Sequence, residues 1–365
     1  MIRHRPALDV LRAYQPGKPI EEVKRELGLT RVVKLASNEN PLGPSPKALK
    51  ALSAAHPTLN EYPEGSCYFL RQALSRRLDV PPDWLLFGNG SDEIILLAAL
   101  AFLNPDDEII MSDFGFVRYE QAAQAMGAKT IKIPMKNWRH DLRGFAAALS
   151  PKTKIVFFSN PNNPIGTMVG KTDVDALIRR VPDDVLIVMD HAYDEYVQSP
   201  DYPDALSYVR RRPNVVVLRT FSKAYGLAGL RVGYAVGRPE VLDVINRVRP
   251  PFNVNRAAQA AATAALDDKA HLRRTIQLNA RERQFLYENY RRLGLTFVES
   301  AANFILVQMP IPAGEAFERL LREGVIVRPM AGAGLSHFVR ISIGTRAENR
   351  ILLAALRKIL GGHSG

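Results

Sequence analysis

Short apolar runs alternate with amphipathic stretches along most of the chain. Residues 154–158, 185–189 and 215–218 are rich in β-branched and aromatic side chains, which predicts buried strands. Between such runs lie segments with apolar residues at helical spacing, such as 94–103. Strands that alternate with helices in this way favour an α/β domain with a mostly parallel central sheet flanked by helices.

The pattern changes after Pro250 and Pro251, which end a predicted helix over 240–249. A long charged helix over 269–293 is followed by strands at 296–298, 304–307, 325–328 and 338–343 and helices at 314–323 and 347–360. This order predicts a small α+β domain. We therefore expect an N-terminal arm over 1–30, a large domain over 31–250 and a small C-terminal domain over 251–365.

Composition excludes several classes of protein. The chain has 365 residues and a net charge of +12, but its basic residues are scattered, without zinc-ligand spacing or an RNA-binding signature, so we expect no nucleic-acid partner. No apolar run approaches the roughly 18 residues of a membrane span, and no apolar signal segment follows the first residues. The single cysteine, Cys67, rules out an internal disulfide and suits the cytoplasm.

One stretch carries the most specific chemistry. Lys223 follows the strand at 215–218, with Thr220 and Ser222 beside it and Arg231 a few residues further on. Alone, a lysine after a strand is usually a solvated loop cation. The hydroxyls and the guanidinium could surround one phosphate, however, and an amine beside a phosphate site suggests a Schiff base with a phosphorylated carbonyl cofactor.

Other polar groups stand at predicted strand ends. The turn at 88–93 opens a helix with small residues, which is either an anion site or an ordinary capped turn. Asp190 ends the strand at 185–189, where sites of α/β proteins lie. Arg328 and Arg340 lie on neighbouring strands and form either one anion pocket or two surface cations.

Several of these motifs resemble those of one enzyme family. Ser222-Lys223, followed by Gly229-Leu-Arg231-Val-Gly233, is similar to the lysine motif of fold-type I pyridoxal-phosphate enzymes. Asp190-His-Ala-Tyr193 and the Asn/Pro turn at 159–167 resemble aminotransferase motifs, with Ile165 in place of the usual threonine. The loop at 37–44 resembles a signature of the histidinol-phosphate aminotransferase subfamily. The resemblance covers about residues 8–360 and implies the fold-type I architecture.

The resemblance also implies a role for each matching residue. Lys223 would bind pyridoxal 5'-phosphate and move the substrate proton, Asp190 would face the pyridine nitrogen, and Tyr193 would contact the 3-oxygen. The other expected cofactor contacts are Gly90, Ser91, Asp92, Phe114, Asn163, Ser222, Arg231 and, across a homodimer interface, Tyr62. The expected substrate contacts are Tyr14, Asn40, Arg328 and Arg340. His191 either packs or helps to orient Asp190.

The implied reaction is transamination between histidinol phosphate and 2-oxoglutarate, with glutamate as product. An aromatic amino-acid aminotransferase would share nearly every motif. A threonine-phosphate decarboxylase would use the same cofactor and similar arginines. A basic binding protein that keeps the fold without catalysis is a further alternative, which the intact Lys223, Asp190 and Tyr193 disfavour.

Overall fold

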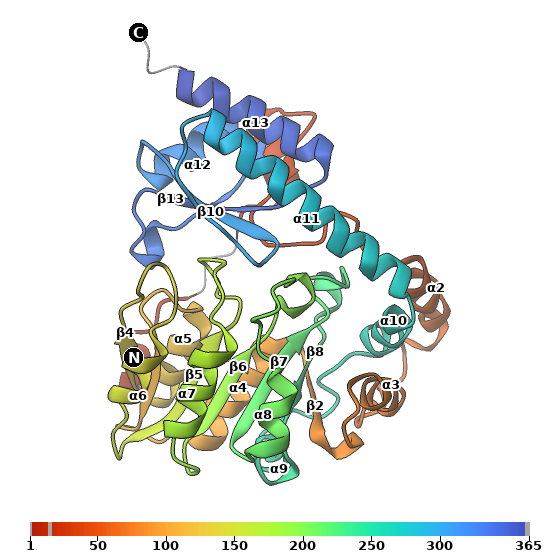
Figure 1. The fold of residues 1–365 in the computed structure, drawn as a ribbon. Helices are drawn as coiled ribbons and strands as arrows, with labels where there is room; N and C mark the ends of the chain where they lie inside the picture. Colours follow the sequence, from red (N-terminus) through yellow and green to blue (C-terminus); the bar gives the residue numbers. More distant parts are fainter. Residues whose placement is uncertain (1, 14–16, 362–365) are drawn as a thin grey trace.

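The computed structural model describes residues 2–13 and 17–361 and shows two domains, one above the other in Figure 1. The large domain contains a seven-stranded sheet in the order β2-β8-β7-β6-β5-β3-β4. All neighbouring pairs are parallel except those made by β8, which is antiparallel to β2 and β7. The expectation of a mostly parallel sheet is confirmed. The strands are β2 (Leu85–Gly88), β3 (Glu108–Ser112), β4 (Lys129–Ile133), β5 (Thr153–Ser159), β6 (Leu186–Asp190), β7 (Val215–Thr220) and β8 (Gly233–Val236).

Successive side chains of the central strands pack on opposite faces of the sheet. Phe157 and Val188 join one apolar cluster, whereas Phe158 and Ile187 join another. This alternation is what a pleated strand buried on both faces requires. The first cluster includes residues of α4 (Ser91–Phe102), α5 (Val117–Met126) and α9 (Pro239–Arg247). The second includes residues of α2 (Pro46–Ala55), α3 (Tyr68–Leu78), α6 (Leu142–Ala147), α7 (Lys171–Arg180), α8 (Ala205–Arg211) and α10 (Arg256–Leu266).

The small domain is an antiparallel sheet with helices packed against it. Its strand order is β12-β13-β10-β9. The strands are β9 (Phe297–Val298), β10 (Phe304–Gln308), β12 (Arg328–Pro329) and β13 (Phe338–Ser342), and the helices are α11 (Lys269–Arg292), α12 (Ala313–Arg322) and α13 (Arg346–Gly361). The helices were expected within one or two residues of these bounds, and the α+β architecture is confirmed.

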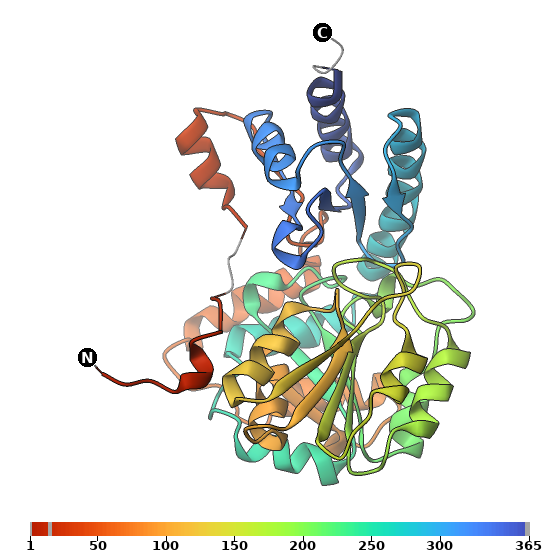
Figure 2. The same ribbon diagram turned by 90° about the vertical axis from the view of Figure 1, so that its left-hand side faces the viewer.

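The strand expected over 325–328 is divided between two sheets. Its first half, β11 (Val325–Ile326), pairs in parallel with β1 (Val33–Lys34), a strand that the pattern did not reveal. Its second half is β12. An N-terminal helix, α1 (Ile20–Leu27), lies beside the small domain in Figure 2, where Val23 packs with Leu321 and Ile326. Helix α1 therefore packs against the C-terminal domain of its own chain.

The apolar clusters bear on the expected domain boundaries at 30/31 and 250/251. Ala258 and Ala261 of α10 pack in the large-domain cluster, whereas Val33 and Leu35 pack in the small-domain cluster. We propose to place the boundary after α10 rather than at Pro250, because a proline can end a helix without ending a domain.

Over residues 2–13 and 17–361, no helix combines the length and the apolarity needed to span a membrane.

Candidate active site

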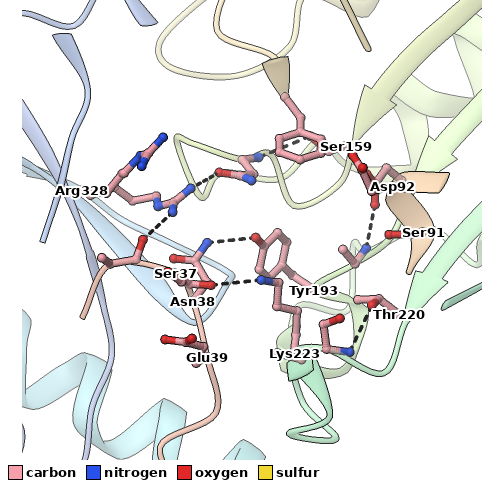
Figure 3. A pocket seen from close by; sticks show the side chains of 18 of the residues that line it. Ser37, Asn38, Glu39, Ser91, Asp92, Ser159, Tyr193, Thr220, Lys223 and Arg328 are labelled. Carbon is pink, nitrogen blue, oxygen red and sulfur yellow. Dashed lines mark hydrogen bonds between the residues drawn. The ribbon is translucent and has the colours of Figure 1, made fainter. Parts of the chain in front are cut away.

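A cavity of about 280 Å³ lies between the two domains, at the carboxyl ends of β5, β6 and β7. Open α/β sheets bind ligands at this edge because the strand-to-helix loops gather there. Figure 3 shows Lys223 and Tyr193 near its centre, Ser91, Asp92 and Thr220 on one side, and Arg328 on the other. The structure brings together in its lining ten of the residues expected to contact the cofactor or the substrate: Ser91, Asp92, Asn163, Asp190, Tyr193, Ser222, Lys223, Arg231, Arg328 and Arg340.

Lys223 presents its amine to the cavity just after β7. Its Nζ donates a hydrogen bond to the Ser37 carbonyl at 3.1 Å and lies 5.8 Å from the centre of the Tyr193 ring. Burial, with the positive charge of Arg340 as the next cause, lowers the pKa of Lys223 to about 8. A lysine with this pKa has a substantial neutral fraction near neutral pH, which is what a nucleophilic amine or general base needs.

Asp190 is the last residue of β6 and pairs in register with Ser159 of β5. Its Oδ1 accepts a hydrogen bond from the Ala192 N–H at 3.1 Å, and its Oδ2 accepts one from the Tyr119 hydroxyl at 2.8 Å. Burial raises the pKa of Asp190, and the Tyr119 hydrogen bond opposes that rise. A carboxylate held in this way at a cavity wall can accept a hydrogen bond from the protonated ring nitrogen of a ligand.

Tyr193 and Asn163 approach the cavity from separate loops. The Tyr193 hydroxyl accepts a hydrogen bond from Asn38 Nδ2 at 2.9 Å, as Figure 3 shows. Asn163 Oδ1 accepts a hydrogen bond from Arg340 Nη1 at 2.5 Å. These two side chains therefore connect the large domain to the N-terminal segment and to the small domain.

Anion donors gather where α4 begins. Ser91 and Asp92 form the first turn of that helix, and Arg231 Nη1 donates to Ser222 Oγ at 3.3 Å. Gly90 does not line the cavity itself, but its backbone has φ +77°, and a Cβ there would lie 2.3 Å from Arg231 Nη2. Only glycine allows this approach. A helix N-terminus beside a guanidinium and a hydroxyl suits a phosphate.

Two arginines form the opposite end of the cavity. Arg328 of β12 and Arg340 of β13 are direct partners across the antiparallel pair. Like charges directly opposite each other destabilise a sheet. Arg340 Nη2 also donates to the Ala36 carbonyl at 2.8 Å, and its guanidinium lies 5.3 Å from the centre of the Phe304 ring. Guanidinium groups in this arrangement can bind a carboxylate or a phosphate, whose charge would offset the repulsion.

The structure places Phe114, an expected cofactor contact, outside the cavity lining. That ring packs against Trp138, with 6.2 Å between ring centres, in an apolar cluster that also contains Ile165. Phe116 borders the cavity instead. The rings of Phe114 and Phe116 take different positions because residues 113–116 form a turn, and the helix begins only at Val117.

Three other expected residues lie away from the cavity lining or outside the description. Asn40 Nδ2 donates to the Ala224 carbonyl at 2.9 Å and to Thr275 Oγ1 at 3.1 Å, so Asn40 supports the lysine loop from behind. Tyr62 is 79% exposed and stacks on Phe252, with 4.8 Å between ring centres. Tyr14 lies outside the described residues.

Some residues near the cavity escaped the sequence interpretation. Asn38 stands in the Asn-rich loop whose signature was recognised, but only the fold shows that it contacts Tyr193. Tyr119 follows Phe116 by three residues, the spacing at which helix neighbours meet. His191 directs its Nδ1 to Asp194 at 3.1 Å and to the Tyr202 hydroxyl at 2.8 Å, and the structure gives it no hydrogen bond to Asp190.

Known proteins are similar to this chain over most of its length. Residues 30–356 match the model of the aminotransferase class I and II family. The histidinol-phosphate aminotransferase of Moorella thermoacetica is 51% identical over 357 residues, covering 98% of this chain and 92% of that protein. The protein of the same name from Caldicellulosiruptor saccharolyticus is 44% identical, covering 98% of this chain and 99% of that protein.

Solved structures are also similar. The histidinol-phosphate aminotransferase of Sinorhizobium meliloti, in complex with pyridoxal-5'-phosphate, superposes with a TM-score of 0.91 at 29% identity, covering 99% of this chain and 98% of that one. The L-threonine-O-3-phosphate decarboxylase of Porphyromonas gingivalis superposes with a TM-score of 0.80 at 25% identity, covering 90% of this chain and 100% of that one.

Proposed function

Because the chain belongs to the aminotransferase class I and II family, we propose that it transfers the amino group of L-histidinol phosphate to 2-oxoglutarate, a step of histidine biosynthesis, with pyridoxal 5'-phosphate as cofactor. The observation that carries the proposal is that one cavity contains Lys223 and Asp190 together with the paired Arg328 and Arg340. The first two suit the cofactor, and the arginine pair suits a phosphorylated substrate. The names of the relatives at 51% and 44% identity support the same substrate.

The residues present fit the proposed cofactor. Lys223 supplies an amine for the aldehyde, and Asp190 supplies an acceptor for the ring nitrogen. The missing Cβ of Gly90 leaves room for the Arg231 guanidinium, which donates to Ser222. Together with Ser91, these groups form a suitable place for the phosphate. When bound, the cofactor supplies an electron-accepting ring and carries the amino group between the two half-reactions.

The chain's own residues then handle the protons. In the loaded protein, the substrate amine would free Lys223 Nζ, which would then serve as the base that takes and returns the proton of the substrate Cα. A pKa of about 8 suits both duties, because the amine is then neither fully protonated nor a weak base near neutral pH. Asp190 keeps the proton on the ring nitrogen through charge pairing. Tyr193 and Asn163, which both line the cavity, would contact the 3-oxygen of the cofactor.

The two arginines serve both halves of the cycle in this proposal. In the first half Arg328 and Arg340 bind the phosphate of histidinol phosphate, and in the second they bind a carboxylate of 2-oxoglutarate or glutamate. A guanidinium offers two parallel N–H donors, which match either anion. The hydrogen bond from Arg340 to the Ala36 carbonyl holds one of these groups in place before substrate arrives.

We also propose a homodimer that works in the cytoplasm. Tyr62 is 79% exposed, and the aromatic side chains Tyr68, Phe69 and Phe252 are exposed at 53%, 77% and 45%. Exposed aromatics of this size favour an interface, and a two-fold interface would let Tyr62 reach the cofactor phosphate of the partner subunit. The single, buried Cys67 suits a reducing compartment.

A steady-state assay tests the substrate. Glutamate formation from 2-oxoglutarate should proceed with histidinol phosphate, with a kcat/KM at least about tenfold above that for phenylalanine, since a hydrogen bond to a charged group contributes about 1.5–3 kcal/mol. A preference for phenylalanine would instead indicate an aromatic aminotransferase. Carbon dioxide release from threonine phosphate without glutamate formation would indicate the decarboxylase. Lys223→Ala should abolish every one of these activities.

A further inference from the structure

Behind the cavity wall, Tyr119 occupies the first turn of α5. It is 1% exposed and does not line the cavity. Its ring stacks on Phe157 of β5, with 4.8 Å between ring centres and 6° between planes, and meets Phe116 edge-on at 5.6 Å. The ring is therefore held between the sheet and the helix start, and its hydroxyl has a defined direction.

That direction leads to Asp190. The Tyr119 hydroxyl donates to Asp190 Oδ2 at 2.8 Å, while the Ala192 N–H donates to Oδ1 at 3.1 Å. Each carboxylate oxygen has two acceptor positions. Two protein donors therefore fix the orientation of the carboxylate and leave acceptor positions for a ligand in the cavity. Phe116, three residues earlier, borders the same cavity, so one turn of chain contributes an apolar wall and a support for the carboxylate.

The hydroxyl is suited to be a permanent donor. Burial raises the pKa of Tyr119 well above its ordinary value, and the adjacent Asp190 charge raises it further, so the phenol stays protonated throughout the working range. A protonated phenol can donate to an ionised carboxylate and stabilises that form. Burial alone would favour the protonated, uncharged form of Asp190.

We propose that Tyr119 is a positioning residue that holds Asp190 ionised and directed at the ring nitrogen of the bound cofactor. The inference rests on the proposed function, because the ring nitrogen belongs to pyridoxal 5'-phosphate. Asp190 and the ring nitrogen share one proton between them. A hydrogen-bond donor to the carboxylate favours the state in which that proton lies on the ring nitrogen. Removal of the donor moves the proton toward the carboxyl group.

The test is the protonation state of the ring nitrogen in Tyr119→Phe, which keeps the ring and removes only the hydroxyl. Protein loaded with ¹⁵N-labelled pyridoxal 5'-phosphate is measured by ¹⁵N NMR without substrate. We expect the variant's signal to move from the protonated toward the unprotonated position. We also expect kcat to fall about tenfold, or ~1.4 kcal/mol in activation free energy, with little change in KM.

Tyr290→Phe is the matched control. Tyr290 is fully buried in the small domain and its hydroxyl has no hydrogen-bond partner in the described structure, so its removal should change neither the signal nor kcat. In an Asp190→Asn background, Tyr119→Phe should cause no further loss, because a residue that acts through Asp190 has nothing left to support. An additional tenfold loss there would contradict the proposal.

A second variant keeps the hydroxyl in place, so that a folding defect of Tyr119→Phe does not decide the test. Replacing Tyr119 by 3-fluorotyrosine preserves its shape and strengthens the donor, so the ring-nitrogen signal should stay at, or move further toward, the protonated position. A wild-type signal retained in Tyr119→Phe would overturn the role of Tyr119 alone. A wild-type protein that binds no pyridoxal 5'-phosphate, or holds its ring nitrogen unprotonated, would overturn the proposed function instead.

Discussion

The amine of Lys223 donates a hydrogen bond to the carbonyl of Ser37 at 3.1 Å, although 186 residues separate the two in the chain. Ser37 belongs to the segment after β1, in which the Leu35 N–H donates to the Ile326 carbonyl at 2.7 Å. The proposed catalytic amine is thus in direct contact with the segment that follows β1, the strand that pairs with β11. Movement of the small domain would change the surroundings of the lysine.

The pH dependence of cofactor capture follows from the pKa of Lys223. Only the neutral amine attacks an aldehyde, and burial lowers the pKa of this lysine from 10.5 to about 8. The rate at which protein freed of cofactor captures pyridoxal 5'-phosphate should therefore rise about tenfold per pH unit below 8 and level off above it. Stopped-flow absorbance measures this rate.

Arg340 should set part of that pH dependence. Its positive charge lowers the pKa of Lys223, so Arg340→Gln should shift the curve to higher pH. Arg291→Gln, at an arginine that is 54% exposed and paired with Glu299, should leave the curve unchanged. A wild-type curve that still rises steeply at about pH 10, the ordinary range for lysine, would contradict the burial argument.

Substitution of Arg340 by alanine tests the shared anion pocket. Arg340→Ala should lower kcat/KM by about 100-fold for histidinol phosphate and for glutamate alike, because a charge-assisted contact contributes about 1.5–3 kcal/mol. Arg340→Lys should recover only part of this, since an ammonium lacks the two parallel donors. Steady-state kinetics with each substrate decide the matter, and a loss confined to one of them would refute a shared pocket.

Gly90→Ala tests the proposed phosphate cradle. The added methyl would lie 2.3 Å from Arg231 Nη2, and the backbone has φ +77°, so we expect the guanidinium to be displaced. Cofactor affinity, measured by titration of absorbance or fluorescence, should fall at least about tenfold, the equivalent of one charge-assisted hydrogen bond. Gly314→Ala is the control, because that methyl meets nothing within 4 Å. Equal affinities for the two variants would argue against the cradle.

Complementation between subunits tests the role of Tyr62. We expect Tyr62→Phe to weaken cofactor binding modestly and Lys223→Ala to abolish turnover. Mixed dimers of the two variants should then contain one site with both Tyr62 and Lys223 intact if the tyrosine acts across the interface. Activity per intact Lys223 above that of the Tyr62→Phe parent is the expected result. A mixture no more active than the Tyr62→Phe parent at equal Lys223 content would place Tyr62 elsewhere.

The sequence predicted the local parts of the fold and site well. Strand-end motifs carry Asp190 and Lys223, and parallel neighbours bring such ends to one edge of the sheet, so their meeting in one cavity could be anticipated. Arg328 and Arg340 were expected on neighbouring strands, and the structure makes them direct partners.

Long-range relations could not be read from periodicity. The two-residue strand β1 is too short to produce a pattern, and its pairing with β11 depends on residues almost three hundred positions away. Phe114 packs in an apolar cluster, whereas Phe116 borders the cavity. Composition does not reveal which of these two phenylalanines takes which place. The hydrogen bond of Tyr119 to Asp190 joins a helix to a strand through buried space, so no local pattern in the sequence singles out Tyr119.

The most direct test of the proposed function is a single half-reaction. Histidinol phosphate is added to protein loaded with pyridoxal 5'-phosphate, without 2-oxoglutarate, and the absorbance of the cofactor is followed. The proposed function predicts conversion of the lysine-linked band to the band of pyridoxamine phosphate, reversed when 2-oxoglutarate is added. A spectrum that histidinol phosphate leaves unchanged, in protein that phenylalanine converts, would contradict it.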